Sequence, residues 1–190
     1  MALKRLARYL KGHPRLVQIF KYQTEIKAME MWCDSDHAGC VRSRKSTSGG
    51  VLMLGGCCIR AYCKQQAVIA LSSGEAEYYG LVSAASNLLG DHSLALDWGI
   101  RLRPHIWMDA TAGIAIGSRR GLGRVKHIDT VFLWCQQVIT SGRVKLGKKS
   151  TQDMLADVLT KAVPEGTMKK ALAEMGFTFK EGKHHKALKV

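Results

Sequence analysis

The chain has 190 residues, of which 46% are apolar, so it can bury one substantial core and is too short for two full-sized domains. Lys and Arg number 29 against 15 Asp and Glu, and this formal net charge of +14 indicates a polyanionic partner, either nucleic acid or an anionic membrane surface. Membrane insertion is not expected, because no stretch approaches the roughly 18 consecutive apolar residues of a spanning helix and the N-terminus lacks the apolar core of a signal peptide.

Leucines at helical spacing mark the first residues of the chain. Leu3, Leu6 and Leu10 recur on one face while lysine and arginine fill the other, and Gly12 and Pro14 end the pattern. This pattern predicts a short basic amphipathic helix. Its charged face fits contact with nucleic acid, and the whole segment is similar in pattern to a targeting peptide. A solvated charged face on a helix that packs through its leucines is an equal alternative.

Short β-prone runs separated by turns rich in Gly and Ser follow from residue 30 onward. The runs at 31–33, 50–54 and 58–63 predict three strands in meander order. Ser72 and Glu75 then have the spacing of a capping box, so a long helix is expected to begin there and to continue to Leu89.

The second half of the chain alternates strand and helix patterns. The predicted elements are a strand over 106–108, a small-residue helix over 110–116, a helix from Ile128 to Gly142, a strand over 143–146, a helix over 151–162, and a weak helix with a basic, histidine-bearing end after Pro164. A meander followed by alternating strands and helices predicts an α/β fold in which helices pack against a mixed sheet.

Acidic residues are scarce in this chain, and several of them lie where burying a charged carboxylate would be unfavourable for folding. Asp34 and Asp36 follow directly on an apolar strand, where an isolated charge is poorly solvated if the strand is central. Glu77 shares a helical stripe with three apolar residues and should point toward the core. Asp109 closes an apolar strand, at the edge where α/β sheets place their sites, and Asp157 lies beside an apolar stripe.

Each of these carboxylates also has an ordinary structural role as an alternative. Asp34 or Asp36 can shape a turn. Asp109 can cap the following helix, and Asp157 can pair with Lys161 at i+4. As a set, however, four carboxylates from two strands and two helices converge only if a cation neutralises their repulsion. Oxygen ligands without an accompanying thiolate or histidine pair suit Mg²⁺ or Mn²⁺ rather than zinc.

Five short motifs occur in order between residues 31 and 164. They read C-D-S-D-H-A-G (33–39), R-K-S-T-S-G-G (44–50), A-L-S-S-G-E-A-E-Y (70–78), K-H-I-D (126–129) and L-A-D-V-L-T-K (155–161). In these motifs the sequence resembles the ribonuclease H domain of copia-type retrotransposon Pol polyproteins. The opening L-K-R-L-A-R-Y-L-K-G (3–12) is similar to the segment that joins the reverse transcriptase to this domain in the same elements.

The resemblance implies a fold and a division of the chain. The fold is a ribonuclease H-like α/β fold, with a mixed five-stranded sheet of three antiparallel meander strands plus two parallel strands, and with helices on both faces. The division assigns 1–26 to a basic helix and linker that resemble the end of the reverse transcriptase, 27–164 to the ribonuclease H-like domain, and 165–190 to a C-terminal helix and basic tail.

Four residues match the catalytic metal ligands of the family, and they are Asp34, Glu77, Asp109 and Asp157. The resemblance implies that they hold two Mg²⁺ ions, with Mn²⁺ as an alternative. Asp36 and Glu75 compete for the first two roles. The helical stripe favours Glu77, although Glu75 has a stripe of its own.

The chain departs from the family at several positions. His37 stands where these elements usually have tryptophan, Gly50 where an aromatic is common, and Ala110 where asparagine is common, so substrate contacts or packing near the site are expected to differ. Relatives often place a histidine in the loop before the last helix, whereas this loop reads G-K-K-S-T (147–151). Proton transfer to the leaving group is therefore without an evident side chain, and slower turnover is one expected consequence. His127 is interpreted as a structural residue, as a lone histidine at the start of a helix usually is, and an approach to the site from its helix is the alternative.

The implied reaction is hydrolysis of the RNA strand of an RNA–DNA hybrid by an in-line water, with one metal ion helping to generate the nucleophile and the other stabilising the leaving 3′ oxygen. Candidate phosphate contacts are Arg42, Arg44, Lys45, Lys148 and Lys149, and a solvated loop face is the alternative for each. The expected partners are the hybrid and the reverse transcriptase portion of the same polyprotein. The fragment is expected to be monomeric and intracellular, in cytoplasmic virus-like particles and in the nucleus.

Two other functions remain open. A catalytically decayed or domesticated copy would keep the fold and the basic surface and only bind nucleic acid. A different nuclease or a transposase of the same general fold would place its acids at other spacings. Polymerase activity is not expected, because the chain has no aromatic-x-Asp-Asp sequence.

Overall fold

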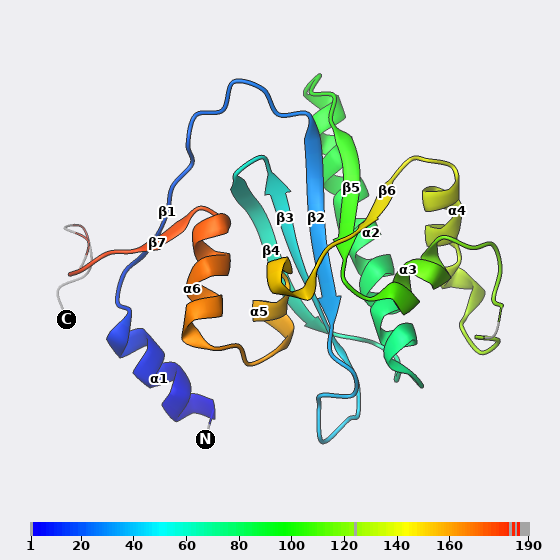
Figure 1. The fold of residues 1–190 in the computed structure, drawn as a ribbon, viewed down its shortest axis with the longest axis horizontal. Helices are drawn as coiled ribbons and strands as arrows, with labels where there is room; N and C mark the ends of the chain where they lie inside the picture. The colour runs from blue at the N-terminus through cyan, green and yellow to red at the C-terminus, as the bar shows by residue number, and fades with distance from the viewer. Residues whose placement is uncertain (1, 124, 183, 185, 187–190) are drawn as a thin grey trace.

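A five-stranded sheet with the strand order β4-β3-β2-β5-β6 forms the centre of the molecule (Figure 1). The computed structural model describes residues 2–123, 125–182, 184 and 186. The strands are β2 (Ala28–Ser35), β3 (Thr47–Leu54), β4 (Cys57–Gln65), β5 (Arg103–Met108) and β6 (Lys145–Lys148). The pairs β2–β3 and β3–β4 are antiparallel, whereas β2–β5 and β5–β6 are parallel. The sheet confirms the fold class expected from the sequence.

Helices cover both faces of this sheet (Figure 1). On one face α2 (Ser73–Asp97) packs against β2 and β3, with α3 (Thr111–Gly117) and α4 (Trp134–Thr140) beside it. On the other face lie α5 (Asp157–Thr160) and α6 (Glu165–Glu174). Because side chains alternate along a strand, the sheet contributes to an apolar core on each face. Leu52 of β3 faces α2, whereas its neighbours Val51 and Met53 face α5 and α6. The prediction of helices on both faces is confirmed.

The helix α2 begins where its capping box was predicted. The hydroxyl of Ser72 accepts a hydrogen bond from the backbone N–H of Glu75 at 3.2 Å. The helix continues to Asp97, beyond the predicted end at Leu89. Its last turns are held by tertiary contacts, since Ala95 is buried and a ring nitrogen of His92 lies 3.0 Å from the carbonyl oxygen of Leu102.

Two helices expected from periodicity are broken in the structure. The predicted helix over 151–162 is a 3₁₀ turn, Thr151–Asp153, followed by an extended residue and the four-residue helix α5. The chain leaves helical geometry at Met154 (φ −77°, ψ 102°), and Met154 and Leu155 are buried. The predicted helix from Ile128 to Gly142 is likewise split into a 3₁₀ turn, Thr130–Phe132, and α4.

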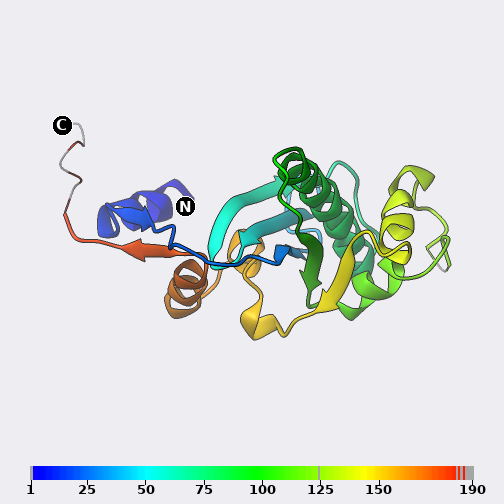
Figure 2. The ribbon, with the colours of Figure 1, turned by 90° about the horizontal axis from the view of Figure 1, so that it is seen from above.

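A second, two-stranded sheet joins the two ends of the described chain (Figure 2). It pairs β1 (Leu16–Gln18) with β7 (Phe177–Phe179), and the sequence analysis did not predict either strand. The basic helix α1 (Ala2–Gly12) is present as predicted, but its leucines are exposed, so it does not pack through them. The division at residues 26 and 164 stays a prediction. Of the predicted basic tail, residues 183, 185 and 187–190 lie outside the described residues.

Within the part of the chain that the structure describes, no helix has both the length and the apolar character needed to cross a membrane.

Candidate active site

Three carboxylates meet at the carboxyl ends of β2 and β5. Asp34 is the second-last residue of β2, Asp109 directly follows β5, and Glu77 lies near the start of α2. Because β2 and β5 are parallel neighbours, their carboxyl ends lie at the same edge of the sheet. One carboxylate oxygen from each of the three residues lies within 4.8 Å of the others. The structure therefore brings together three of the four predicted metal ligands.

A glycine lets α3 approach α2 closely enough to place Glu77 there. A Cβ atom on Gly113 of α3 would lie 2.9 Å from Cβ of Glu77, closer than real side chains pack. On its other side α2 packs against the end of β2, where a Cβ on Gly80 would make an ordinary van der Waals contact of 3.4 Å with Cβ of Ser35. The close contact of α2 with both α3 and β2 holds the Glu77 carboxylate beside Asp34.

Burial and mutual repulsion perturb these carboxylates. Burial raises the pKa of Glu77 to about 8, and the charges of Asp34 and Asp109 contribute to this increase. Burial also raises the pKa of Asp34, although the hydrogen bond from Thr160 and the charge of Lys161 oppose it. Among the described residues, Oε2 of Glu77 is a buried oxygen that has no hydrogen-bond partner.

These features fit a hard divalent cation. The three clustered side chains offer only oxygen atoms, which are the ligands that Mg²⁺ and Mn²⁺ prefer. A cation there would offset the burial and the repulsion that together raise the pKa of Glu77, and it would give the buried Oε2 of Glu77 a partner. The group opens into a cavity of about 300 Å³, which is lined by Asp34, Ser73, Gly74, Glu77, Asp109, Ala110, Thr111, Ala112 and Lys161.

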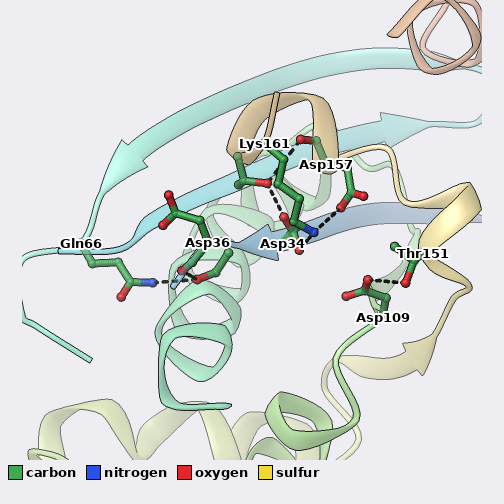
Figure 3. A network of polar contacts seen from close by, with 9 residues as sticks. Asp34, Asp36, Gln66, Asp109, Thr151, Asp157 and Lys161 are labelled. Carbon is green, nitrogen blue, oxygen red and sulfur yellow. Dashed lines mark hydrogen bonds and ion pairs between the residues drawn. The ribbon is translucent and has the colours of Figure 1, made fainter. Parts of the chain in front are cut away.

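Asp157, the fourth predicted ligand, is linked to this group through a lysine (Figure 3). The Nζ atom of Lys161 lies 3.1 Å from Oδ1 of Asp157 and 3.2 Å from Oδ1 of Asp34. The i+4 pairing considered as an ordinary role for Asp157 is therefore present. The hydroxyl of Thr160 also donates to Oδ2 of Asp34. Asp157 thus lies near the acid group formed by Asp34, Glu77 and Asp109, and the ammonium of Lys161 lies between Asp157 and Asp34.

The competitor Glu75 has a different set of contacts. Its carboxylate is buried and accepts hydrogen bonds from the backbone N–H of Leu71 and the hydroxyl of Tyr79, both at 2.9 Å. Nε2 of His127 lies 2.7 Å from Oε2 of the same carboxylate. Glu75 therefore ties the segment around His127 to the start of α2, which agrees with a structural role for that histidine.

The competitor Asp36 shapes a turn. Its Oδ1 accepts a hydrogen bond from the backbone N–H of Thr47, across the connection between β2 and β3. In Figure 3 its carboxylate points away from Asp34. The geometry thus favours Asp34 and Glu77 over their neighbours, and the catalytic role of these residues stays a prediction.

The predicted phosphate contacts have different surroundings. Lys148 donates to the hydroxyl of Thr111 at 2.9 Å, on the wall of the cavity. The ammonium of Lys149 lies 4.7 Å and 5.2 Å from the ring centres of Trp107 and Trp32, which hold it by cation–π interactions. Arg42, Arg44 and Lys45 lie in the connection between β2 and β3, where both arginines are exposed. Nucleic-acid binding by these five residues stays a prediction.

Of the three departures from the family pattern, the structure explains Gly50. A Cβ on Gly50 would lie 2.3 Å from Cε1 of Tyr62, so the tyrosine of the neighbouring strand occupies the space over this glycine. Ala110 precedes α3 without making a side-chain cap, and His37 is exposed. In the loop without histidine, the hydroxyl of Thr151 donates to Oδ2 of Asp109 at 2.8 Å (Figure 3).

Three contacts of the site were not predicted from the sequence. The hydroxyls of Thr160 and Thr151 reach Asp34 and Asp109, and Lys161 reaches Asp34 as well as Asp157. The last two residues of the L-A-D-V-L-T-K motif are Thr160 and Lys161, so the motif contained the signal, but no local pattern shows that they reach across to β2.

Comparisons with known proteins give relatives that include retrotransposon Pol polyproteins. No protein-family model matches the chain. The chain is 31% identical over 180 residues, 93% of its length, to the retrovirus-related Pol polyprotein from transposon RE1 of Arabidopsis thaliana. It is 33% identical over 163 residues, 84% of its length, to the corresponding polyprotein from transposon RE2 of the same plant. The chain spans 12% and 11% of the lengths of these two relatives.

Among solved structures, the chain is similar to LC11-RNase H1, a protein isolated from compost. The sequence identity is 15%, the TM-score is 0.49, and the match covers 77% of this chain and 99% of the other.

Proposed function

Since the chain is a homologue of one segment of retrotransposon Pol polyproteins, as its motifs indicated, we propose that it is a ribonuclease H domain. It hydrolyses the RNA strand of RNA–DNA hybrids and depends on divalent metal ions. The observation that carries this proposal is the convergence of Asp34, Glu77 and Asp109, with carboxylate oxygens within 4.8 Å of one another, at the carboxyl edge of β2 and β5.

In this proposal the metal is Mg²⁺, with Mn²⁺ as an alternative, and two ions take part. Asp34, Glu77 and Asp109 would hold one ion, and Asp34 together with Asp157 would hold the other. When bound, the ions supply Lewis acidity to the phosphodiester and lower the pKa of the attacking water. Thr151 holds Asp109 in place through its hydrogen bond of 2.8 Å.

Substrate binding is assigned to the basic surface around the cavity. Lys148 is anchored to Thr111 on the cavity wall and is placed to contact a phosphate of the RNA strand. Arg42, Arg44 and Lys45 extend the positive charge from the end of β2, and the formal net charge of +14 favours a polyanionic partner. Recognition of a hybrid requires contacts to 2′-hydroxyls on one strand and to deoxyribose on the other.

We also propose that the domain works beside the reverse transcriptase portion of a Pol polyprotein, as a monomeric unit inside the cell. Its place there is the cytoplasmic virus-like particle and the nucleus. This proposal rests on the homology to Pol polyproteins, of which the chain spans about an eighth.

A cleavage assay on the purified chain tests the proposed activity. An RNA–DNA hybrid, a double-stranded RNA, a double-stranded DNA and a single-stranded RNA, each end-labelled, are incubated with and without Mg²⁺. The proposal expects cleavage of the RNA in the hybrid alone, and only with Mg²⁺. Binding of the hybrid without cleavage would contradict it and would favour a module that only binds nucleic acid, the alternative to which the loop without histidine points.

A further inference from the structure

Lys161 is a cation of the chain itself that lies between two of the predicted metal ligands (Figure 3). Its Nζ atom is 3.2 Å from Asp34 and 3.1 Å from Asp157, and its side chain also lines the cavity that contains Glu77 and Asp109. In the described part of the chain, Glu77 and Asp109 form no ion pair. Within the described residues, Glu77 and Asp109 therefore have no ammonium bound to them, whereas Asp34 and Asp157 share that of Lys161.

We propose that Lys161 is an internal counter-ion that a second divalent cation must displace, so that metal ions bind to this site in two unequal steps. This inference rests on the proposed function, because it takes the acid group as a metal site. The first cation binds among Asp34, Glu77 and Asp109. The second binds between Asp34 and Asp157, and it does so only when the ammonium leaves.

The surroundings of Lys161 allow this exchange. Asp34 is almost completely buried, with 1% of its side chain exposed, so its charge needs a cation beside it. Lys161 has 42% of its side chain exposed and follows the short helix α5, so its flexible stem can carry the ammonium into water. A divalent ion placed between the same two carboxylates replaces the lysine charge and restores the neutralisation of Asp34.

The two ion pairs of Lys161 set the size of the effect on metal affinity. The second metal ion must break both pairs when it binds, and because partly exposed pairs are weak, this corresponds to about a tenfold loss in its affinity. Removing the lysine charge should therefore tighten the second binding step by about tenfold.

The test is a titration of the whole chain with Mn²⁺ in the absence of nucleic acid. Binding is measured by calorimetry and by the electron paramagnetic resonance signal of free Mn²⁺. The variants are Lys161→Gln, which removes the charge, and Lys161→Arg, which keeps it. The matched control is Lys170→Gln, since Lys170 also bridges two carboxylates, at 3.3 Å and 3.8 Å, and neither belongs to the acid group.

The expected result is two unequal Mn²⁺ steps in the unchanged chain, in Lys161→Arg and in Lys170→Gln, and a second step about tenfold tighter in Lys161→Gln. Equal steps in the unchanged chain, or a second step that Lys161→Gln leaves unchanged or weakens, would overturn the inference. If Lys161→Gln does not fold, Lys161→Met, which also removes the charge and has a side chain of similar length, replaces it in the same comparison.

The outcome is separable from that of the cleavage assay. A chain that shows the expected Mn²⁺ steps without cutting a hybrid contradicts the proposed function alone. A chain that cuts the hybrid while Lys161→Gln leaves Mn²⁺ binding unchanged contradicts only the role of Lys161.

Discussion

Replacing Glu77 by Gln should stabilise the metal-free protein at pH 8, although it removes a predicted catalytic residue. The carboxylate is largely buried beside Asp34 and Asp109, and its pKa is raised from the ordinary value of 4.5 to about 8. Ionising this group therefore disfavours the folded state, by at most about 5 kcal/mol, since one pH unit of difference corresponds to about 1.4 kcal/mol. Glutamine has nearly the same shape and carries no charge.

The raised pKa of Glu77 determines how the stability gained by Glu77→Gln depends on pH. Well below pH 4.5, Glu77 is protonated in both the folded and the unfolded chain, so the substitution changes little. As the pH rises toward 8, the unfolded chain ionises Glu77 while the folded chain resists, and the unchanged protein loses stability that Glu77→Gln keeps. The advantage of Glu77→Gln should grow by about 1.4 kcal/mol for each pH unit between pH 5 and 7.

Urea unfolding at pH 5, 6, 7 and 8 in the presence of EDTA measures this advantage. The matched control is Glu75→Gln, which should lower the free energy of unfolding at pH 7 by about 1–3 kcal/mol, because an amide cannot reproduce all the hydrogen bonds that the Glu75 carboxylate accepts. An advantage of Glu77→Gln that does not vary with pH, or a loss of stability at pH 8, would refute the explanation of its raised pKa.

Two further substitutions test the packing behind the site. Gly117→Ala should lower the free energy of unfolding by about 1–3 kcal/mol, because its Cβ would lie 2.5 Å from Cδ2 of the fully buried Leu81. Urea unfolding measures this loss, and unchanged stability would show that the side chains of the core rearrange without cost. Tyr78→Phe should cost about 1 kcal/mol in the same measurement, because the hydroxyl of Tyr78 donates to the carbonyl oxygen of Phe132 at 2.8 Å, and no loss would mean that this bond does not hold the 3₁₀ turn there.

The places of Asp34 and Asp109 could be predicted because they depend on local patterns. Each follows an apolar run, and the ends of neighbouring parallel strands meet by a general rule of α/β sheets. Periodicity could not separate Glu77 from Glu75, because α2 is buried over a wide arc that includes Tyr79 and Val82. The two glutamates differ in what lies opposite them, which is the sheet edge for Glu77 and the segment of His127 for Glu75.

The contacts that close the site depend on long-range packing. Lys161 reaches Asp34 across 127 positions of the chain, and no local pattern carries that information. The break in the predicted helix over 151–162 has the same origin, since the chain turns at Met154 to bury Met154 and Leu155. The pairing of β1 with β7 was missed because three-residue strands are too short to show a period.

The most direct test of the active site is the initial rate of hybrid cleavage in Mg²⁺ for two variants, Glu77→Gln and Glu75→Gln, each measured at a temperature where it is folded. The account expects Glu77→Gln to lose activity by at least about a hundredfold, because a ligand of the metal ion is removed, while Glu75→Gln keeps a rate within about tenfold of the unchanged chain. Cleavage that survives Glu77→Gln and is abolished by Glu75→Gln in a folded protein would contradict the assignment of the site.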